Sequence, residues 1–217
     1  MTASACCVRH DGLLLRVAAG NMPDLSHKHP HTMAQLILSA GKEKSLLRRH
    51  PWIFEGSVER LEGRARSGDT VDVVAGGGRY AGKLLGRAAW SPASMIRARV
   101  WTFDEETIDD AFFKRRVAAA VARRAALPAL RDEDGQRLIH AESDGLPGVI
   151  ADRYRDEISG DTVVIQLTSA GADKWREAIA NALQKATGCA RIYERSDSDV
   201  RGREGLEPVS GWLRGAA

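Results

Sequence analysis

The stretch KSLLRRHPWIFEG, residues 44–56, sets cations directly beside large aromatic side chains. Lys and Arg side chains neutralise phosphates and release their counterions, and aromatic rings stack on unpaired bases. A later stretch, SMIRARVWTF, alternates with the period of a strand and carries two further arginines on one face. The candidate RNA-contacting residues are Lys42, Lys44, Arg48, Arg49, His50, Arg97 and Arg99.

These residues can also be interpreted as purely structural, without a role in RNA binding. The cations would then only keep the surface soluble, and Trp52 and Trp101 would pack in the core. For the tryptophans alone we favour core packing, and for the cations we favour nucleic-acid binding. We expect the cations of residues 42–49 to share one short helix, ended by Pro51, which residues 52–54 anchor to a sheet.

Two further motifs resemble cofactor or nucleophile sites and are better explained by structure. GGGRYA, residues 76–81, satisfies a dinucleotide fingerprint, but Gly82 and Gly86 interrupt the helix that this motif requires. No Asp or Glu occurs between Val73 and Phe103 to hold a ribose, so we predict a hairpin turn. Cys189 follows a predicted helix C-terminus, where the dipole disfavours a thiolate, and we predict a buried core thiol.

Two polar stretches of the second half are interpreted as connections. HAESDGLPG, residues 140–148, carries a histidine, a serine and two acids, but the members of a catalytic triad rarely lie so close in sequence. Its Asp-Gly and Pro-Gly dipeptides indicate a structured turn. ERSDSDVRGREGL, residues 194–206, fits no calcium-loop spacing and is interpreted as a solvated connector. We therefore assign no catalytic, cofactor-binding or metal-binding residue.

Composition indicates an ordinary globular protein with an uneven charge distribution. Hydrophobic residues make up 43% and charged residues 28% of the 217 positions. Residues 33–103 hold 12 Lys and Arg against 6 Asp and Glu, a net charge of +6, whereas residues 104–217 hold 17 against 21, a net charge of −4. The basic first part is the better candidate for meeting a polyanion. Three cysteines without a CxxC pair favour a reducing, cytoplasmic location, and no apolar run is long enough to span a membrane.

The hydrophobic pattern divides the chain into four parts. Residues 1–32 are expected to be a disordered leader, with Met33 as an alternative start, and His27, His29 and His31 are interpreted as a polar tail rather than a metal site. Short strands separated by glycine turns predict a small β-barrel over residues 33–103. A helix after residue 104, with a buried stripe of Phe113, Val117 and Val121, opens an α+β domain over residues 104–205. Residues 206–217 are expected to be a linker.

Four motifs in this order resemble one protein family: GKEKSLLRRHPWIF, SPASMIRARVWTF, RLIHAESDGLPGVIADRY and IYERSD…VRGREGL. They are similar to the front part of the RlmI-type bacterial 23S ribosomal RNA methyltransferases, which act on the five-position of cytosine. The resemblance runs from about residue 35 to about residue 213. It implies a PUA domain, which is a small RNA-binding pseudo-barrel, then a central α+β domain and a C-terminal Rossmann-like domain for S-adenosylmethionine.

The sequence departs from this family at its end. It stops at Ala217, where the methyltransferase domain is expected to begin, and the glycine-rich cofactor loop, the Asp-Pro-Pro motif and the nucleophilic cysteine are absent. We therefore expect a mixed α+β fold without a complete Rossmann domain and without S-adenosylmethionine bound to this chain. The resemblance implies an RNA-binding, substrate-positioning fragment whose partner is ribosomal RNA.

Several alternatives stay open. The chain is inactive alone in the leading hypothesis, which leaves open a separately encoded methyltransferase domain that would complete it and, independently, a homodimer. A second hypothesis is a stand-alone PUA-type adaptor that recruits another protein to RNA. A third is a self-sufficient enzyme that uses His140 and its neighbours. Neither the target nucleotide nor the origin of the early end follows from the sequence.

Overall fold

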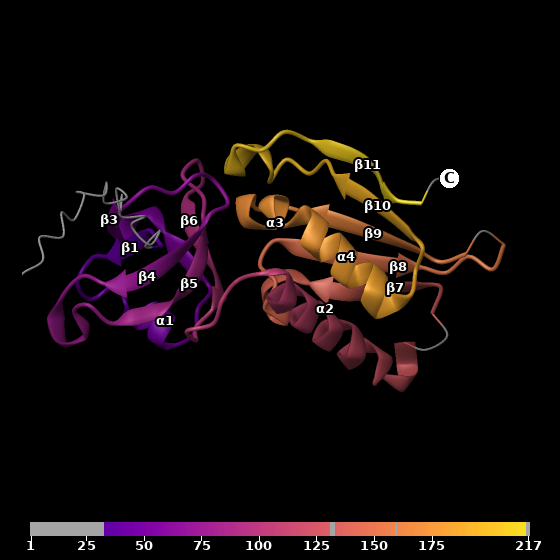
Figure 1. Cartoon of the computed structure of the whole chain (residues 1–217), viewed down its shortest axis with the longest axis horizontal. Coiled ribbons are helices and arrows are strands. Elements are labelled where there is room, and N and C mark those ends of the chain that lie inside the picture. Colours follow the sequence, from indigo (N-terminus) through magenta and orange to yellow (C-terminus); the bar gives the residue numbers. More distant parts are fainter. Residues whose placement is uncertain (1–32, 131–132, 159, 216–217) are drawn as a thin grey trace, which may run out of the picture. The chain divides into compact units, whose positions relative to one another are not determined.

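Two sheets organise the described chain, which a computed structural model covers over residues 33–130, 133–158 and 160–215 (Figure 1). The expectation of a mixed α+β fold is confirmed. The predicted leader over residues 1–32, and with it the histidines at 27, 29 and 31, lies outside the described residues.

The first sheet has six strands in the order β2-β6-β5-β4-β1-β3. Neighbouring strands run antiparallel, except that β1 and β4 are parallel. The β-branched alternation of TVDVVA forms β4, as the sequence predicts. The strands are β1 (Gln35–Leu38), β2 (Trp52–Phe54), β3 (Val58–Glu62), β4 (Thr70–Ala75), β5 (Leu84–Trp90) and β6 (Ile96–Thr102).

The first sheet curls around an apolar cluster that includes Leu36, Ile53 and Val71. Gly86 allows this curl, because its φ is 149° and a side chain there would overlap the carbonyl oxygen of Thr102. The pairings of β4 with β5 and of β5 with β6 both shift register next to this glycine. Such irregularities increase the local bend of a sheet. The predicted small barrel is thus found as a curled sheet.

The predicted hairpin at GGGRYA is confirmed. The short 3-10 turn η2 (Gly78–Tyr80) connects the antiparallel strands β4 and β5. No long helix follows these glycines, so the helix N-terminus that a dinucleotide fingerprint needs is not formed here.

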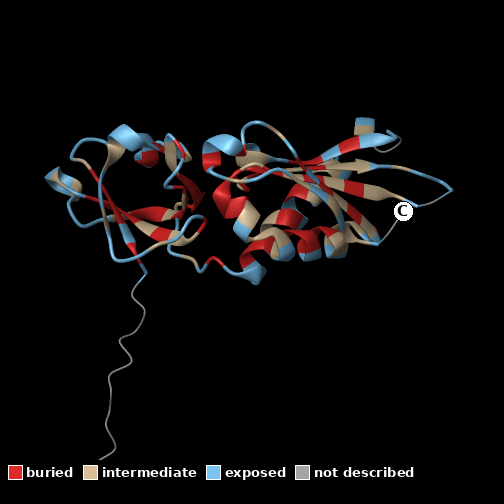
Figure 2. Cartoon of the chain, turned by 90° about the horizontal axis from the view of Figure 1, so that it is seen from above, coloured by how far each residue is buried: buried red, intermediate tan, exposed pale blue. Residues whose placement is uncertain are grey.

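The second sheet has five strands in the order β11-β10-β9-β8-β7. Figure 1 shows helices α2 and α4 on the same side of this sheet, and Figure 2 shows buried residues along the strands and these helices. The elements are α2 (Asp110–Ala125), β7 (Gly135–His140), β8 (Val149–Tyr154), β9 (Thr162–Leu167), α3 (Ala170–Lys174), α4 (Arg176–Thr187), β10 (Arg191–Ser196) and β11 (Val209–Arg214).

The helix expected after residue 104 begins at Asp110 as α2, and the helix C-terminus predicted before Cys189 is found at the end of α4. Asp109 caps α2 by accepting a hydrogen bond from the Phe112 amide at 2.8 Å. Gly188 ends α4 in the left-handed conformation, with φ 72°. The predicted stripe on α2 is buried at Phe113 and Val117, and Val121 is partly buried against the same cluster. Cys189 is buried as well, as predicted.

The described residues from 33 onward belong to one compact unit, and several contacts join its two sheets. Ala89 and Trp101 of the first sheet lie in the same buried cluster as Phe112 and Phe113 of α2. The Trp101 and Phe113 rings meet edge to face, with centroids 5.2 Å apart. Apolar packing thus continues from one sheet into the other.

Two predictions about the last third of the chain are wrong. Residues 206–217 were expected to form a linker, but β11 lies within them and pairs with β10 along the sheet edge. Residues 194–206 were expected to be a solvated connector, but Arg201 and Glu204 are 2% and 1% exposed. Both side chains satisfy their charge with distant partners, which a local charge pattern does not reveal.

Candidate nucleic-acid interface

A short basic segment precedes β2 on the first sheet. We call Lys42, Lys44, Arg48 and Arg49 the basic turn. All four side chains are exposed, while the buried Leu46 fixes the segment to the core. Within the described part of the chain, none of the four makes an ion pair, whereas Arg87 on the same sheet is paired with Asp72 at 3.0 Å. The charge of the basic turn is therefore available to an anion.

The helix in this segment is shorter than predicted. Helix α1 (Lys44–Leu47) has four residues, and Arg48 already caps its C-terminus. Arg49 follows in the left-handed conformation, with φ 60°, and its guanidinium lies over the Phe103 ring at 5.4 Å. The four cations therefore lie within and on both sides of a single helical turn, and not on one face of a longer helix.

Three aromatic side chains continue from the basic turn, and we call His50, Trp52 and Phe54 the aromatic step. Neighbouring rings in it have centroids 6.0 and 6.2 Å apart and meet edge to face. The prediction that residues 52–54 anchor the helix is only right for Ile53, because Trp52 is 36% and Phe54 46% exposed. Strand alternation explains this result, since it turns Ile53 inward and both aromatic neighbours outward. Exposed rings of this kind can stack on unpaired bases.

Arg97 and Arg99 differ from the basic turn in that their charges are already paired. Arg97 donates to the Glu55 carboxylate and to the Pro92 carbonyl. Arg99 is only 7% exposed and donates to Glu204 at 2.8 Å. We therefore leave these two arginines out of the surface that we propose below and keep the basic turn and His50.

The aromatic step is tied to the 3-10 turn η4 (Ala141–Asp144) that follows β7. The Trp52 indole Nε1–H donates to Glu142 Oε1 at 2.7 Å. Asp144 fixes η4 by accepting hydrogen bonds from Arg124, from Arg123 and from the His140 amide. Burial raises the pKa of the Asp144 carboxyl, but these hydrogen bonds outweigh burial and leave the pKa below its usual value. Nothing in the sequence indicates the hydrogen bond between Trp52 and Glu142, because these residues lie 90 positions apart.

The polar groups of η4 do not assemble into a catalytic set. Glu142 is held by Trp52, and Asp144 by two arginines. Within the described residues, no hydrogen bond links the His140 ring to Ser143 or Glu142. The described chain also contains no group of three His, Cys, Asp or Glu side chains that could hold a metal ion. In the same residues, no helix has the length and apolar character needed to cross a membrane.

The β9–α3 connection does not offer a free helix N-terminus to a ligand such as S-adenosylmethionine. The β9–α3 connection is the place where a strand–helix–strand unit could offer a helix N-terminus to a ligand. There the Ala170 N–H donates to Glu204 at 3.4 Å, and Ser169 caps the helix through the Ala172 N–H. The chain's own side chains thus occupy this position, and no glycine-rich loop surrounds it.

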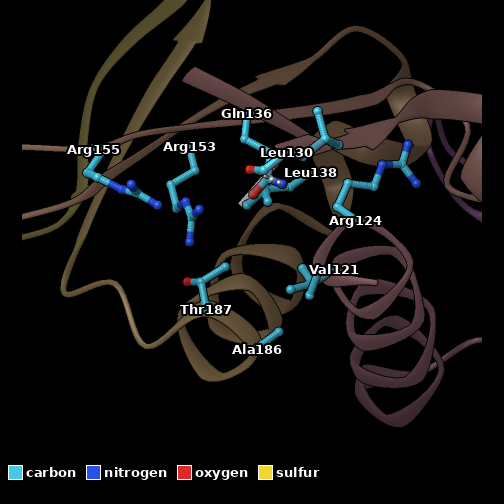
Figure 3. Close-up of a pocket in the computed structure, with 10 residues that line it drawn as sticks. Val121, Arg124, Leu130, Gln136, Leu138, Arg153, Arg155, Ala186 and Thr187 are labelled. Carbon is cyan, nitrogen blue, oxygen red and sulfur yellow. Dashed lines mark hydrogen bonds between the residues drawn. The ribbon is translucent and has the colours of Figure 1, made fainter. Parts of the chain in front are cut away.

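A cavity of about 350 Å³ lies between the second sheet, the end of α2 and the end of α4 (Figure 3). Figure 3 shows Arg153 and Arg155 pointing from the sheet toward it. Arg124 also lines the cavity, but its guanidinium donates to Asp144. Arg153 Nε lies 3.9 Å from Asp161 Oδ2. Because it brings together no nucleophile and base, this cavity offers no reaction that the sequence or fold supports.

Comparison with known proteins finds a family model for the first sheet and relatives that match most of the chain. A family model for the PUA-like domain matches residues 36–103. The chain is 54% identical over 178 residues to "Ribosomal RNA large subunit methyltransferase I" of Klebsiella pneumoniae subsp. pneumoniae, a match that covers 82% of this chain and 42% of that protein. The protein of the same name from Salmonella enteritidis is 52% identical over 182 residues, or 83% of this chain and 43% of the relative. The chain thus spans less than half the length of these curated relatives.

Solved structures show the same fold at lower sequence identity. A protein described as a SAM-dependent methyltransferase from Streptococcus mutans has a TM-score of 0.63 at 16% identity, over 84% of this chain and 43% of that one. A methyltransferase structure in complex with SAH has a TM-score of 0.64 at 17% identity, with the same coverage. At these identities the likeness shows the fold alone.

Proposed function

We propose that this chain, which belongs to the family of ribosomal RNA large subunit methyltransferase I, binds ribosomal RNA and positions it for methylation. The basic turn binds phosphates, and the aromatic step lies against unpaired bases. The described residues supply substrate positioning and not the chemical step. The substrate is 23S ribosomal RNA and the modified atom is the five-position of cytosine, as the resemblance of the sequence implies. A cytoplasmic location follows from this substrate.

The observation that carries the proposal is a set of unpaired cations beside exposed aromatic rings on a PUA-like domain. Elsewhere in the described chain, most arginines form an ion pair with an acidic side chain, for example Arg87 with Asp72. Among the described residues the basic turn has no such partner, so its cations keep their attraction for phosphate. Exposed Trp and Phe side chains cost solubility unless they bind a partner, and bases are partners with a matching flat surface.

Removing the charges of the basic turn tests the proposal. The triple variant Lys42→Ala, Lys44→Ala, Arg48→Ala should bind a 23S ribosomal RNA fragment about tenfold or more weakly, because three phosphate contacts are lost. Its slope of log K against log salt should fall by about two, since each contact with single-stranded RNA contributes roughly 0.7. Fluorescence anisotropy of a labelled fragment, titrated at several salt concentrations, measures both quantities.

A matched variant separates local contacts from overall charge. Lys114, Lys185 and Arg203 are exposed in the second half of the chain, and their replacement by alanine removes the same three charges. This control should change the affinity less than threefold. Equal losses in the two triple variants would contradict the proposed surface. Methylation of ribosomal RNA by this chain alone would contradict the positioning role.

The alternative function is a stand-alone RNA-binding adaptor without methyltransferase activity. The chain's coverage of 42% of its curated relative is compatible with it. Both functions predict the same RNA binding. Methyl incorporation on addition of a separately encoded methyltransferase domain favours the positioning role, and its absence together with capture of another protein on RNA favours the adaptor.

A further inference from the structure

A small cleft lies where the basic turn meets the second half of the chain. Its lining includes Arg49, Phe103, Arg116 and Glu142, and we call it the seam cleft. Its volume is about 210 Å³. Pockets for whole small molecules are larger, about 300–1,000 Å³. The seam cleft therefore suits one flat ring system better than a complete nucleotide or cofactor.

Backbone strain is concentrated beside this cleft. Among the described residues, Arg49 and Ala141 are the two non-glycine residues with positive φ, at 60° and 43°. Arg49 lines the cleft, and Ala141 directly precedes Glu142, which lines it as well. Left-handed backbone is unfavourable for a residue with a side chain. Such residues gather at functional sites, where the surrounding structure holds them in place.

Specific hydrogen bonds hold both strained residues. The Arg49 N–H donates to the Leu46 carbonyl at 2.8 Å. The Ala141 carbonyl accepts from the Leu146 N–H at 3.1 Å. The Arg49 guanidinium lies over the Phe103 ring, at 5.4 Å from the ring centroid. The lining of the cleft thus contains a flat cation lying over an aromatic ring.

The lining of the cleft also includes a carboxylate, Glu142, that can accept a hydrogen bond. Glu142 Oε1 already accepts from the Trp52 indole at 2.7 Å and lies 3.9 Å from Arg99. Within the described residues, no hydrogen bond reaches its second oxygen, Oε2. The side chain is 24% exposed. Carboxylates accept from exocyclic amines of bases, and an aromatic or guanidinium plane stacks on the base face.

We propose that the seam cleft accepts one unpaired base of the bound RNA, stacked against Arg49 and Phe103, with its exocyclic amine donating to Glu142 Oε2. Adenine, cytosine and guanine carry such an amine, and uracil does not. Arg116, which is 37% exposed and pairs with Glu106 at 3.1 Å, lies near enough to the cleft to meet the adjoining phosphate. The inference rests on the proposed RNA binding and adds a base preference to it.

Single-stranded RNA oligonucleotides that differ at one position test this inference. The ligands are a uridine decamer and the same decamer with one central cytidine or adenosine, and binding is followed by fluorescence anisotropy. The unaltered chain should bind the cytidine- and adenosine-containing oligonucleotides about tenfold more tightly than oligouridine, since uracil has no exocyclic amine to donate to Glu142. Glu142→Gln should reduce this preference to less than threefold.

Three variants distinguish the cleft from general RNA binding. Glu157→Gln makes the same chemical change at an exposed acid of the β8–β9 connection and should leave the preference unchanged. The basic-turn triple variant should weaken all oligonucleotides equally and keep the preference. Arg49→Gly should raise Tm by about 2–4 °C, because the strain is relieved, while the preference falls.

Two results overturn the inference. One is RNA binding without any preference between the oligonucleotides. The other is a preference that survives Glu142→Gln. Both leave the proposed function in place, whereas failure of the unaltered chain to bind any RNA would refute the proposed function itself.

Discussion

Replacing Glu204 by alanine is expected to destabilise the folded chain by about 3–5 kcal/mol. Glu204 accepts hydrogen bonds from Arg99 at 2.8 Å, from the Ser91 hydroxyl at 2.8 Å and from the Ala170 N–H at 3.4 Å. The side chains of Arg99 and Glu204 are 9% and 1% exposed. Removing Glu204 leaves the desolvated charge of Arg99 with only the more distant Glu142, at 3.9 Å, to compensate it.

The expected loss is a large fraction of the total stability, which is about 5–15 kcal/mol for a typical protein. For chains of about this length, 1 kcal/mol corresponds to roughly 2–4 °C in Tm. Glu204→Ala should therefore lower Tm by about 6–20 °C. Urea unfolding followed by tryptophan fluorescence gives the free energy directly, and a thermal melt followed by circular dichroism gives Tm.

Two further variants show whether the loss comes from the unpaired charge. Glu207→Ala removes an exposed acid of the same segment and should change the free energy of unfolding by less than about 0.5 kcal/mol. The double variant Arg99→Met, Glu204→Leu removes both charges and should recover much of the stability that the single variant loses. A loss below about 1 kcal/mol in Glu204→Ala would refute the reasoning.

Two other predictions concern η4 and the turn before β8. The lowered pKa of Asp144 means that its ionised form stabilises the fold above the usual pKa of 3.8, and that this stability is lost as the pH falls through the lower folded value. Urea midpoints from pH 6 to pH 2 should therefore drop more steeply for the unaltered chain than for Asp144→Asn, and parallel curves would contradict this assignment. Gly148→Ala should cost about 2–3 kcal/mol, because φ is 76° and the new methyl group would overlap Ser169, the cap of α3. Gly41→Ala is the control, because φ is 84° there and open space surrounds the glycine. It should cost only the backbone strain, about 1–2 kcal/mol. Equal losses of stability in Gly148→Ala and Gly41→Ala would contradict a cost from the overlap with Ser169.

Local patterns of the sequence were sufficient for much of the fold. Alternation identified β4 and β6, the glycines identified the hairpin at residues 76–81, and Gly188 identified the end of α4. These features depend on residues a few positions apart, which a single sequence displays directly.

The errors arose where charge or aromatic character depends on a distant partner. Arg201 and Glu204 looked solvated, because their partners lie 28 and 105 positions away along the chain. Trp52 looked like a core residue, because its exposed position and its bond to Glu142 follow from the packing of β2. The charge pattern singled out the residues of the basic turn as candidates, but nothing in the sequence indicates the left-handed backbone of Arg49 or its contact with Phe103.

During synthesis, Arg99 is made long before Glu204, the carboxylate with which it pairs. A ribosome makes about 5–20 residues each second, so the 105 positions between these two residues take roughly 5–20 s to appear. During this time the first sheet is complete in sequence while the guanidinium of β6 still lacks its carboxylate. Although β6 is paired on both sides, the Arg99 side chain must therefore stay hydrated until the segment around Glu204 is made, and a stall in translation before that point would prolong a state prone to wrong contacts.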